Sequence, residues 1–280
     1  MFQYRSLTCL TLALILPLPL QAQNVSTESE TQMSYSDIVD LSLAARLVIR
    51  AEIRKQAVLE PERAPGLAPG FVRLYIEART LSLIAGQSAL GESLTYLVDV
   101  PLDQRGKVPK LKKREVLLFA RPVPGSATAI QLVGAQGQFL YSPEFEARIR
   151  PVLADIVSPE SPPVILGVRD ALSVPGNLIG ESETQIFLET DDGSPVSISV
   201  LRRPGRQPAW GVSWGEIIDA AARPPAANTI AWYRLACALP ERLPADANLA
   251  RDPAPRAQAA RDYAYVMGAL GPCGRSLSSL

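Results

Sequence analysis

The sequence contains no histidine in its 280 residues. This absence excludes Ser-His-Asp and Cys-His catalysis, zinc sites built on imidazole and a histidine-based pH switch. Any enzyme activity would have to use carboxylates, lysine, tyrosine or a metal ion bound by oxygen atoms. We find no motif for a cofactor or a metal ion, and we predict neither.

The chain also lacks a net charge, because its 28 basic side chains are balanced by 28 acidic ones. Proteins dedicated to nucleic-acid binding usually carry a basic stripe and a high pI, so no nucleic-acid partner is expected. Hydrophobic residues make up 47% of the chain and charged residues 20%, which is typical of globular proteins. The length indicates one or two domains.

Long apolar runs are missing as well. The stretch Leu7–Leu20 is interrupted by prolines and is shorter than the roughly 18 residues that span a membrane. Arg5 precedes it and "LQA" follows it, which predicts a signal peptide over residues 1–22 with Gln23 as the first mature residue. We therefore expect a periplasmic or secreted protein without a transmembrane segment.

Cysteine is scarce, and removal of the signal peptide leaves Cys237 and Cys273. Two cysteines in an exported chain predict one disulfide. Closing a loop of about 35 residues would stabilise the fold by about 3–4 kcal/mol. Because the Cα atoms of a disulfide lie within about 7 Å, the helices expected before the two cysteines should cross or run roughly parallel.

Alternating apolar residues dominate the first half of the chain. A polar lead-in is expected over residues 23–33, followed by a short helix capped by Ser36. About five strands then follow before Tyr141. The pattern predicts a β-rich domain over residues 34–142, either an OB-like barrel or a small sandwich.

The second half is mixed, and the fold class predicted for the whole chain is α+β. A helix and a linker occupy residues 143–163, with Ser142 as the helix cap. Residues 164–280 are expected to form an α+β domain with one disulfide. It contains a β-hairpin with a two-residue turn at Asp192-Gly193, and three C-terminal helices.

The segment "IGESETQIF" begins like the G-x-S-x-G elbow of a nucleophilic serine. Thr184 replaces the closing glycine, a hairpin strand follows, and no histidine is present to activate Ser182. We interpret the segment as a strand entrance in which the Ser182 hydroxyl bonds nearby backbone. "LGESLTYLV", at residues 90–98, repeats the pattern and is expected to have the same role.

Four of the five lysines after the signal peptide lie in "RGKVPKLKKREV". One interpretation is a binding site for lipid headgroups or acidic polysaccharide. The alternative is a solvated loop that protects the following apolar strand from edge pairing. The candidate binding residues are Lys107, Lys110, Lys112, Lys113 and Arg114.

Two hypotheses for the function follow, and no catalytic residue is assigned. The first is a binding or interaction protein without catalytic activity, whose partner is an anionic envelope component or another periplasmic protein. The second is a hydrolase of an envelope polymer that uses two carboxylates about 5–10 Å apart. Its candidates are Asp170, Glu181, Glu183 and Asp219, whereas the three tryptophans are expected in the core.

Several phrases carry a resemblance, among them "ERAPGLAPG", "YLVDVPLD", "GESETQIFLET" and "AWYRLACALP". With its frequent Arg, Ala and Pro, the chain resembles a family of exported proteins from sphingomonad-type alphaproteobacteria. The resemblance covers most of the mature chain. It implies export but no activity, ligand or functional residue.

Overall fold

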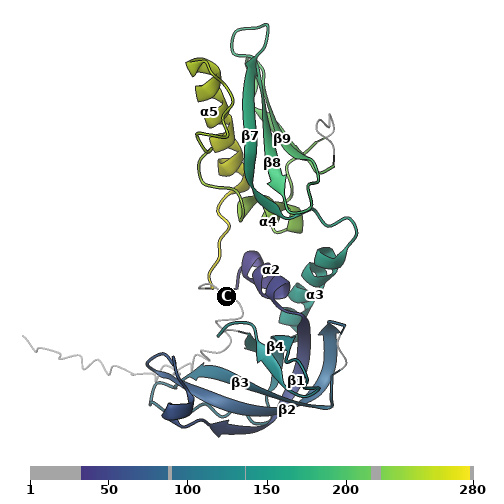
Figure 1. The fold of residues 1–280 in the computed structure, drawn as a ribbon, viewed down its shortest axis with the longest axis vertical. Coiled ribbons are helices and arrows are strands. Elements are labelled where there is room, and N and C mark those ends of the chain that lie inside the picture. Colours follow the sequence, from purple (N-terminus) through teal and green to yellow (C-terminus); the bar gives the residue numbers. More distant parts are fainter. Residues whose placement is uncertain (1–32, 88–89, 136, 216–221, 278–280) are drawn as a thin grey trace, which may run out of the picture.

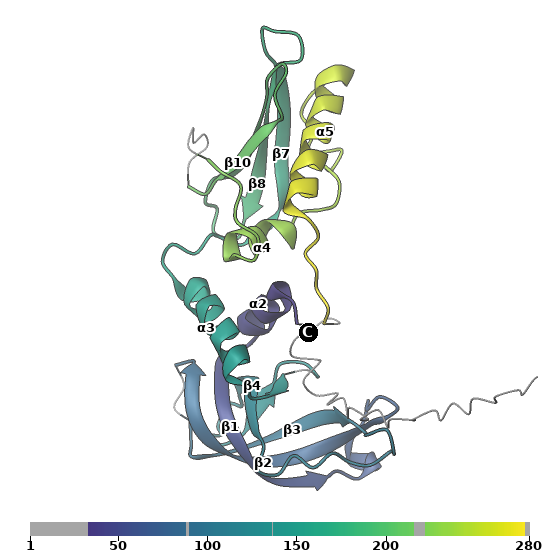
Figure 2. The same ribbon diagram turned by 180° about the vertical axis from the view of Figure 1, so that it is seen from behind.

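The computed structural model describes residues 33–87, 90–135, 137–215 and 222–277. The fold is α+β, as predicted, with two separate antiparallel sheets (Figure 1). The first sheet lies at the lower end in Figures 1 and 2 and the second at the upper end, with helices α2 (Tyr35–Ala44) and α3 (Pro143–Val157) between them. The expected signal peptide lies outside the described residues.

The first sheet has the strand order β3-β2-β1-β4-β5, and β6 also pairs with β4. Its inner face buries the alternating residues of β1 that the sequence pattern places together, such as Ile49 and Ile53. The strands are β1 (Leu47–Val58), β2 (Phe71–Ala85), β3 (Ser93–Pro101), β4 (Glu115–Pro122), β5 (Ile130–Leu132) and β6 (Gln138–Leu140).

No closed barrel forms from this sheet. Its edge strands β3 and β5 meet at a single parallel bridge between Thr95 and Ala129, and no ladder continues along the two edges. The segment expected as the fifth strand divides into β5 and β6. Phe119 of β4 bonds a residue on each side of the division: its carbonyl accepts from the Val133 amide, and its amide donates to the Gly137 carbonyl. A Cβ on Gly137 would lie 2.8 Å from the Phe119 carbonyl oxygen.

Helix α2 begins two residues earlier than the sequence indicates. Ser34, not Ser36, is the cap: its hydroxyl accepts from the Asp37 amide while the Asp37 carboxylate accepts from the Ser34 amide. This reciprocal arrangement satisfies two backbone donors at once. Ser142 caps α3 as predicted, and α3 continues through Pro151 as one helix.

The second sheet has the order β10-β9-β8-β7. The predicted hairpin is formed by β8 and β9, but its two-residue turn is wrong, because the β8–β9 pairing stops at Leu188 and Val196 and residues 191–195 form a longer connection. Asp192 accepts from the Ser194 amide within it. The strands are β7 (Ile165–Pro175), β8 (Ser182–Thr190), β9 (Val196–Arg202) and β10 (Ala209–Ser213).

Two helices of the second half are described, α4 (Ile230–Ala236) and α5 (Pro253–Leu270). Thr229 caps α4, and Gly271, with a φ of 72°, ends α5. Helix α5 packs against β7 and β8. The helix expected to follow Ser213 falls on residues 216–221, outside the described residues. No helix in the described part of the chain is long and apolar enough to cross a membrane.

Candidate binding surface

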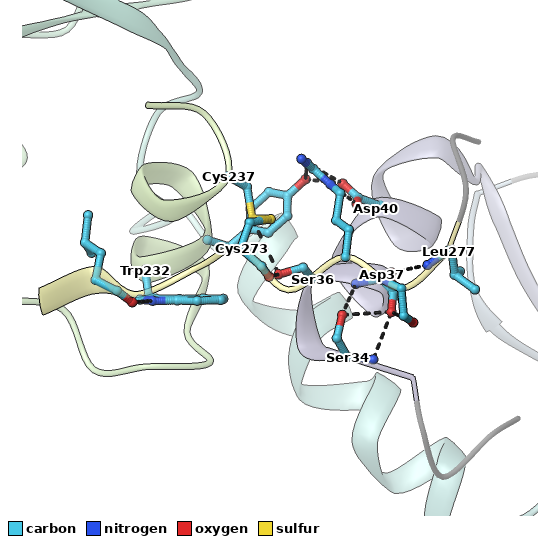
Figure 3. The surroundings of a disulfide bond; sticks show 12 residues. Ser34, Ser36, Asp37, Asp40, Trp232, Cys237, Cys273 and Leu277 are labelled. Carbon is cyan, nitrogen blue, oxygen red and sulfur yellow. Dashed lines mark hydrogen bonds and ion pairs between the residues drawn. A yellow bond between two sulfur atoms is a disulfide. The ribbon is translucent and has the colours of Figure 1, made fainter. Parts of the chain in front are cut away.

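The two cysteines meet where α4 and α5 end. Cys237 directly follows α4 and Cys273 follows α5; their Cα atoms are 4.9 Å apart and their sulfurs 2.08 Å, the distance of the predicted disulfide (Figure 3). Trp232 of α4 donates its indole N–H to the Leu270 carbonyl of α5 at 2.8 Å. This contact joins the two helices next to the cysteine pair.

Beyond α5, residues 271–277 form a C-terminal tail that lies on the start of α2 (Figure 3). The Asp37 carboxylate accepts from the Ser276 amide at 2.9 Å and from the Leu277 amide at 3.0 Å. Burial acts to raise the pKa of Asp37, but the hydrogen bonds from Ser276, Leu277 and Ser34 lower the pKa to about 2. The carboxylate is therefore held ionised against the tail.

The same helix makes two further contacts with the tail. Ser36, predicted as a cap, is fully buried and donates its hydroxyl to the Cys273 carbonyl at 2.5 Å. Asp40 forms an ion pair with Arg275 at 2.6 Å and accepts from the Tyr233 hydroxyl of α4. Burial, followed by the bond to Asp40, raises the pKa of Tyr233 to about 12. Helix α2 is thus attached to both α4 and the tail.

The predicted anion-binding residues form one ordered segment, residues 105–114, which we call the basic loop. Gln56 at the end of β1 holds it: the side-chain amide donates to the Pro109 carbonyl at 2.9 Å and accepts from the Leu111 amide at 2.6 Å. Val108 and Leu111 are half-buried against the core of the first sheet. The loop is therefore anchored through its apolar side chains and its backbone.

Cations of the basic loop stand in solvent. None takes part in an ion pair with the described residues, whereas Lys55 pairs with Glu77 at 2.9 Å and Arg73 with Asp99 at 2.6 Å on the neighbouring strands. Strand β4, which follows the loop, has β1 on one side and β5 and β6 on the other, so it offers little free edge to protect. The exposed cations are Arg105, Lys107, Lys110, Lys112, Lys113 and Arg114.

Ser182 begins β8 and Ser93 begins β3, so both copies of the Gly-Glu-Ser pattern are strand entrances. The predicted bond of the Ser182 hydroxyl to backbone is wrong, since no hydrogen bond among the described residues involves that hydroxyl. The side chain that bonds nearby backbone is Glu181: its carboxylate accepts from the amides of Asn177 at 3.1 Å and Leu178 at 3.3 Å. The serine has no base beside it and remains structural.

Asp170 and Glu183, two of the carboxylates proposed for a hydrolase, lie apart on neighbouring strands. Asp170 pairs with Arg169, and Glu181 is bound to loop backbone. Glu183 lies four ladder positions from Asp170, about 13 Å along the strand at 3.3 Å per residue. Asp219 lies outside the described residues. Asp170 and Glu183 thus lie farther apart than the roughly 5–10 Å that the reaction needs, and no group of metal ligands occurs among the described residues.

A buried polar cluster beneath α5 was not found from the sequence. Asp262 is fully buried and accepts from the Thr184 hydroxyl and from Arg202 Nε, both at 2.5 Å. Gln258 donates to the same carboxylate at 2.9 Å. These bonds satisfy the carboxylate, so the cluster attaches α5 to β8 and β9 and is closed to a ligand.

A sequence signal for this cluster does exist. Asp262 lies on the helical stripe that faces the sheet, at the i, i+3, i+4 and i+7 spacing of a buried face. Its buried neighbours on the stripe are Ala259, Tyr263 and Val266. Reading that periodicity would have identified a buried charge that needs a partner.

The tryptophans belong to the core, as predicted. Trp232 is buried, while Trp210 and Trp214 are partly buried against the same hydrophobic cluster. They present no aromatic platform.

No protein-family model matches this chain, and no curated protein matches it. The resemblance to exported proteins of sphingomonads therefore stays a prediction, and the function has to be argued from the surface itself.

Proposed function

We propose that the chain is an exported binding protein without catalytic activity, whose basic loop binds an anionic component of the cell envelope. The observation that carries the proposal is the set of six exposed cations without ion-pair partners among the described residues. Clustered cations raise the local concentration of polyanions and speed their association.

The way in which the loop is anchored supports a polymeric ligand. Val108 and Leu111 face the core, so the exposed side of the loop is cationic and carries no large apolar residue. Such a surface binds through charge rather than by insertion into lipid. An acidic polysaccharide chain fits it better than a bilayer or an apolar protein surface does.

Export is part of the proposal and rests on two features. Residues 1–22 have the charge, apolar stretch and small-residue site of a signal peptide. Cys237 and Cys273 lie at disulfide distance, and disulfides persist in oxidising compartments such as the periplasm.

Isothermal titration calorimetry with polygalacturonate, a linear acidic polysaccharide, tests the ligand class. We expect binding that weakens steeply with added salt, and at least a tenfold loss of affinity in the double variant Lys110→Gln/Lys112→Gln.

A matched control variant, Arg203→Gln/Arg206→Gln, removes two exposed cations from the other sheet and should bind polygalacturonate as the wild type does. Equal binding of neutral dextran, or full affinity in the loop variant, would contradict the proposal. Polymer recovered with new reducing ends would instead favour the carboxylate hydrolase.

A further inference from the structure

Two loops leave the same end of the second sheet. Residues 176–181 join β7 to β8, and residues 203–208 join β9 to β10. Ser182 pairs with Arg202, so the loops start from directly opposed positions on adjacent strands, about 4.8 Å apart. We call the two loops the apical tip; the β7–β8 loop is at the top of Figure 1, far from the first sheet.

The β7–β8 loop presents apolar side chains to solvent. Leu178 is 62% exposed and Ile179 is 100% exposed. Glu181 holds the loop in this shape by accepting from the amides of Asn177 and Leu178. Further exposed apolar residues lie on the adjoining strands, and such gatherings are rare on monomeric proteins away from interaction sites. They are Leu172, Val174 and Leu201.

Arginines of the β9–β10 loop lie beside this apolar surface. Arg203 and Arg206 are exposed, form no ion pair with the described residues, and line a hollow of about 210 Å³ together with Gln207. Arg202, by contrast, is bound to Asp262. A guanidinium group presents a planar fork of donors that matches the oxygens of a phosphate.

Acidic groups at this end are already engaged. The Glu181 carboxylate accepts from loop backbone, and Glu183 accepts from the Gln185 side-chain amide at 2.8 Å. These neutral donors leave the charges of the two carboxylates in place, but they direct the carboxylate oxygens to the loop and to Gln185. Arg203 and Arg206 form no ion pair with the described residues, so their guanidinium groups are available to an anionic ligand. Apolar side chains next to unpaired cations are complementary to a surface that is anionic outside and apolar beneath.

We propose that the apical tip docks on a bilayer that contains anionic phospholipid. Leu178 and Ile179 enter the boundary between headgroups and acyl chains, while Arg203 and Arg206 bind headgroup phosphates. Stable interfacial binding needs both apolar burial and electrostatic attraction, and the tip offers both. This contact is separate from the polysaccharide contact proposed for the basic loop.

Vesicle flotation tests the docking. We expect the full chain to float with vesicles of phosphatidylglycerol and phosphatidylethanolamine, and much less with phosphatidylcholine alone. Leu178→Asp/Ile179→Asp should reduce the bound fraction at least tenfold, and Arg203→Gln/Arg206→Gln should reduce it severalfold and weaken its salt dependence. The basic-loop variant Lys110→Gln/Lys112→Gln should float as the wild type does, which separates this proposal from the first.

Three outcomes would overturn the proposal: no flotation of the wild type, unchanged flotation of the Leu178/Ile179 variant, or loss of flotation only in the basic-loop variant. Displacement from vesicles by millimolar inorganic phosphate would assign the arginines to free phosphate instead of lipid. Circular dichroism of each variant confirms that it is folded, which is expected because the substituted side chains are exposed.

A second measurement reports insertion directly. In Ile179→Trp, the added fluorescence should shift to the blue on phosphatidylglycerol vesicles and be quenched by brominated acyl chains. The same substitution at exposed Val157, the last residue of α3, should show neither change. An unshifted spectrum at position 179 on vesicles that carry bound protein would contradict insertion.

Discussion

The basic loop and the apical tip are built in opposite ways. Both connect antiparallel strands, but the loop turns Val108 and Leu111 toward a core and leaves its cations in solvent. At the tip, Leu178 and Ile179 face solvent and the Glu181 carboxylate turns back to the loop backbone. The surroundings of each loop explain which of its side chains face solvent. The basic loop covers the end of a hydrophobic core, whereas the tip extends beyond the end of its sheet.

The two ends also differ in how they are attached to the rest of the molecule. The side chains of Gln56 and Asp103 bond the backbone of the basic loop. The strands below the tip are attached to α5 by the buried cluster around Asp262. Between the ends, the C-terminal tail and α2 join the two halves of the chain. Three comparisons of variants separate these contributions.

The largest effect is expected from Asp262→Ala. It leaves Arg202 and Thr184 without their buried acceptor, and breaking such a pair typically costs about 3–5 kcal/mol. Urea unfolding should show this loss in the free energy of unfolding. The matched variant Asp170→Ala, on the surface of the same sheet, should change it by less than about 0.5 kcal/mol. Equal stability of the two variants would mean that the cluster does not brace α5.

An intermediate effect concerns the tail and depends on pH. The folded-state pKa of Asp37, about 2, is below its ordinary value of 3.8, so its contribution is present above about pH 4 and is lost as pH falls through about 2. The difference corresponds to about 2 kcal/mol. Acid unfolding curves of wild type and Asp37→Asn should therefore converge as pH falls. A constant gap between them from pH 6 to pH 2 would contradict the assigned role.

The smallest effects compare one substitution at the two sites. Leu111→Asp places a charge against the core of the first sheet and should cost about 1–2 kcal/mol. Leu178→Asp changes an exposed side chain and should stay within about 0.5 kcal/mol. Thermal melts of the two variants measure the contrast directly. If Leu178→Asp were the more destabilising, the tip would be packed rather than presented to a partner.

Local rules predicted much of the fold. The strands of the first sheet and the cap Ser142 depend on neighbouring residues, and the sequence pattern located them. The cysteine pairing followed from a count, since only two cysteines lie outside the predicted signal peptide. The candidate basic residues were also visible, because they lie next to one another in the chain.

Contacts between distant residues could not be predicted in this way. The bond of Ser36 to Cys273, the division of the fifth strand at Gly137 and the bonds of Asp262 to Thr184 and Arg202 each depend on a partner that is distant in the chain. The exposure of Ile179 could not be predicted either, because isoleucine is usually a buried residue.

By itself, then, the amino-acid sequence determined the α+β class, the order of most elements and the one disulfide, since each follows from periodicity, capping or composition. Only the tertiary structure decided that the first sheet stays open, that the tail attaches to α2, and which loop faces a core and which faces solvent. The physical reason is that burial is a property of packed neighbours, and those neighbours come from residues that the sequence keeps far apart.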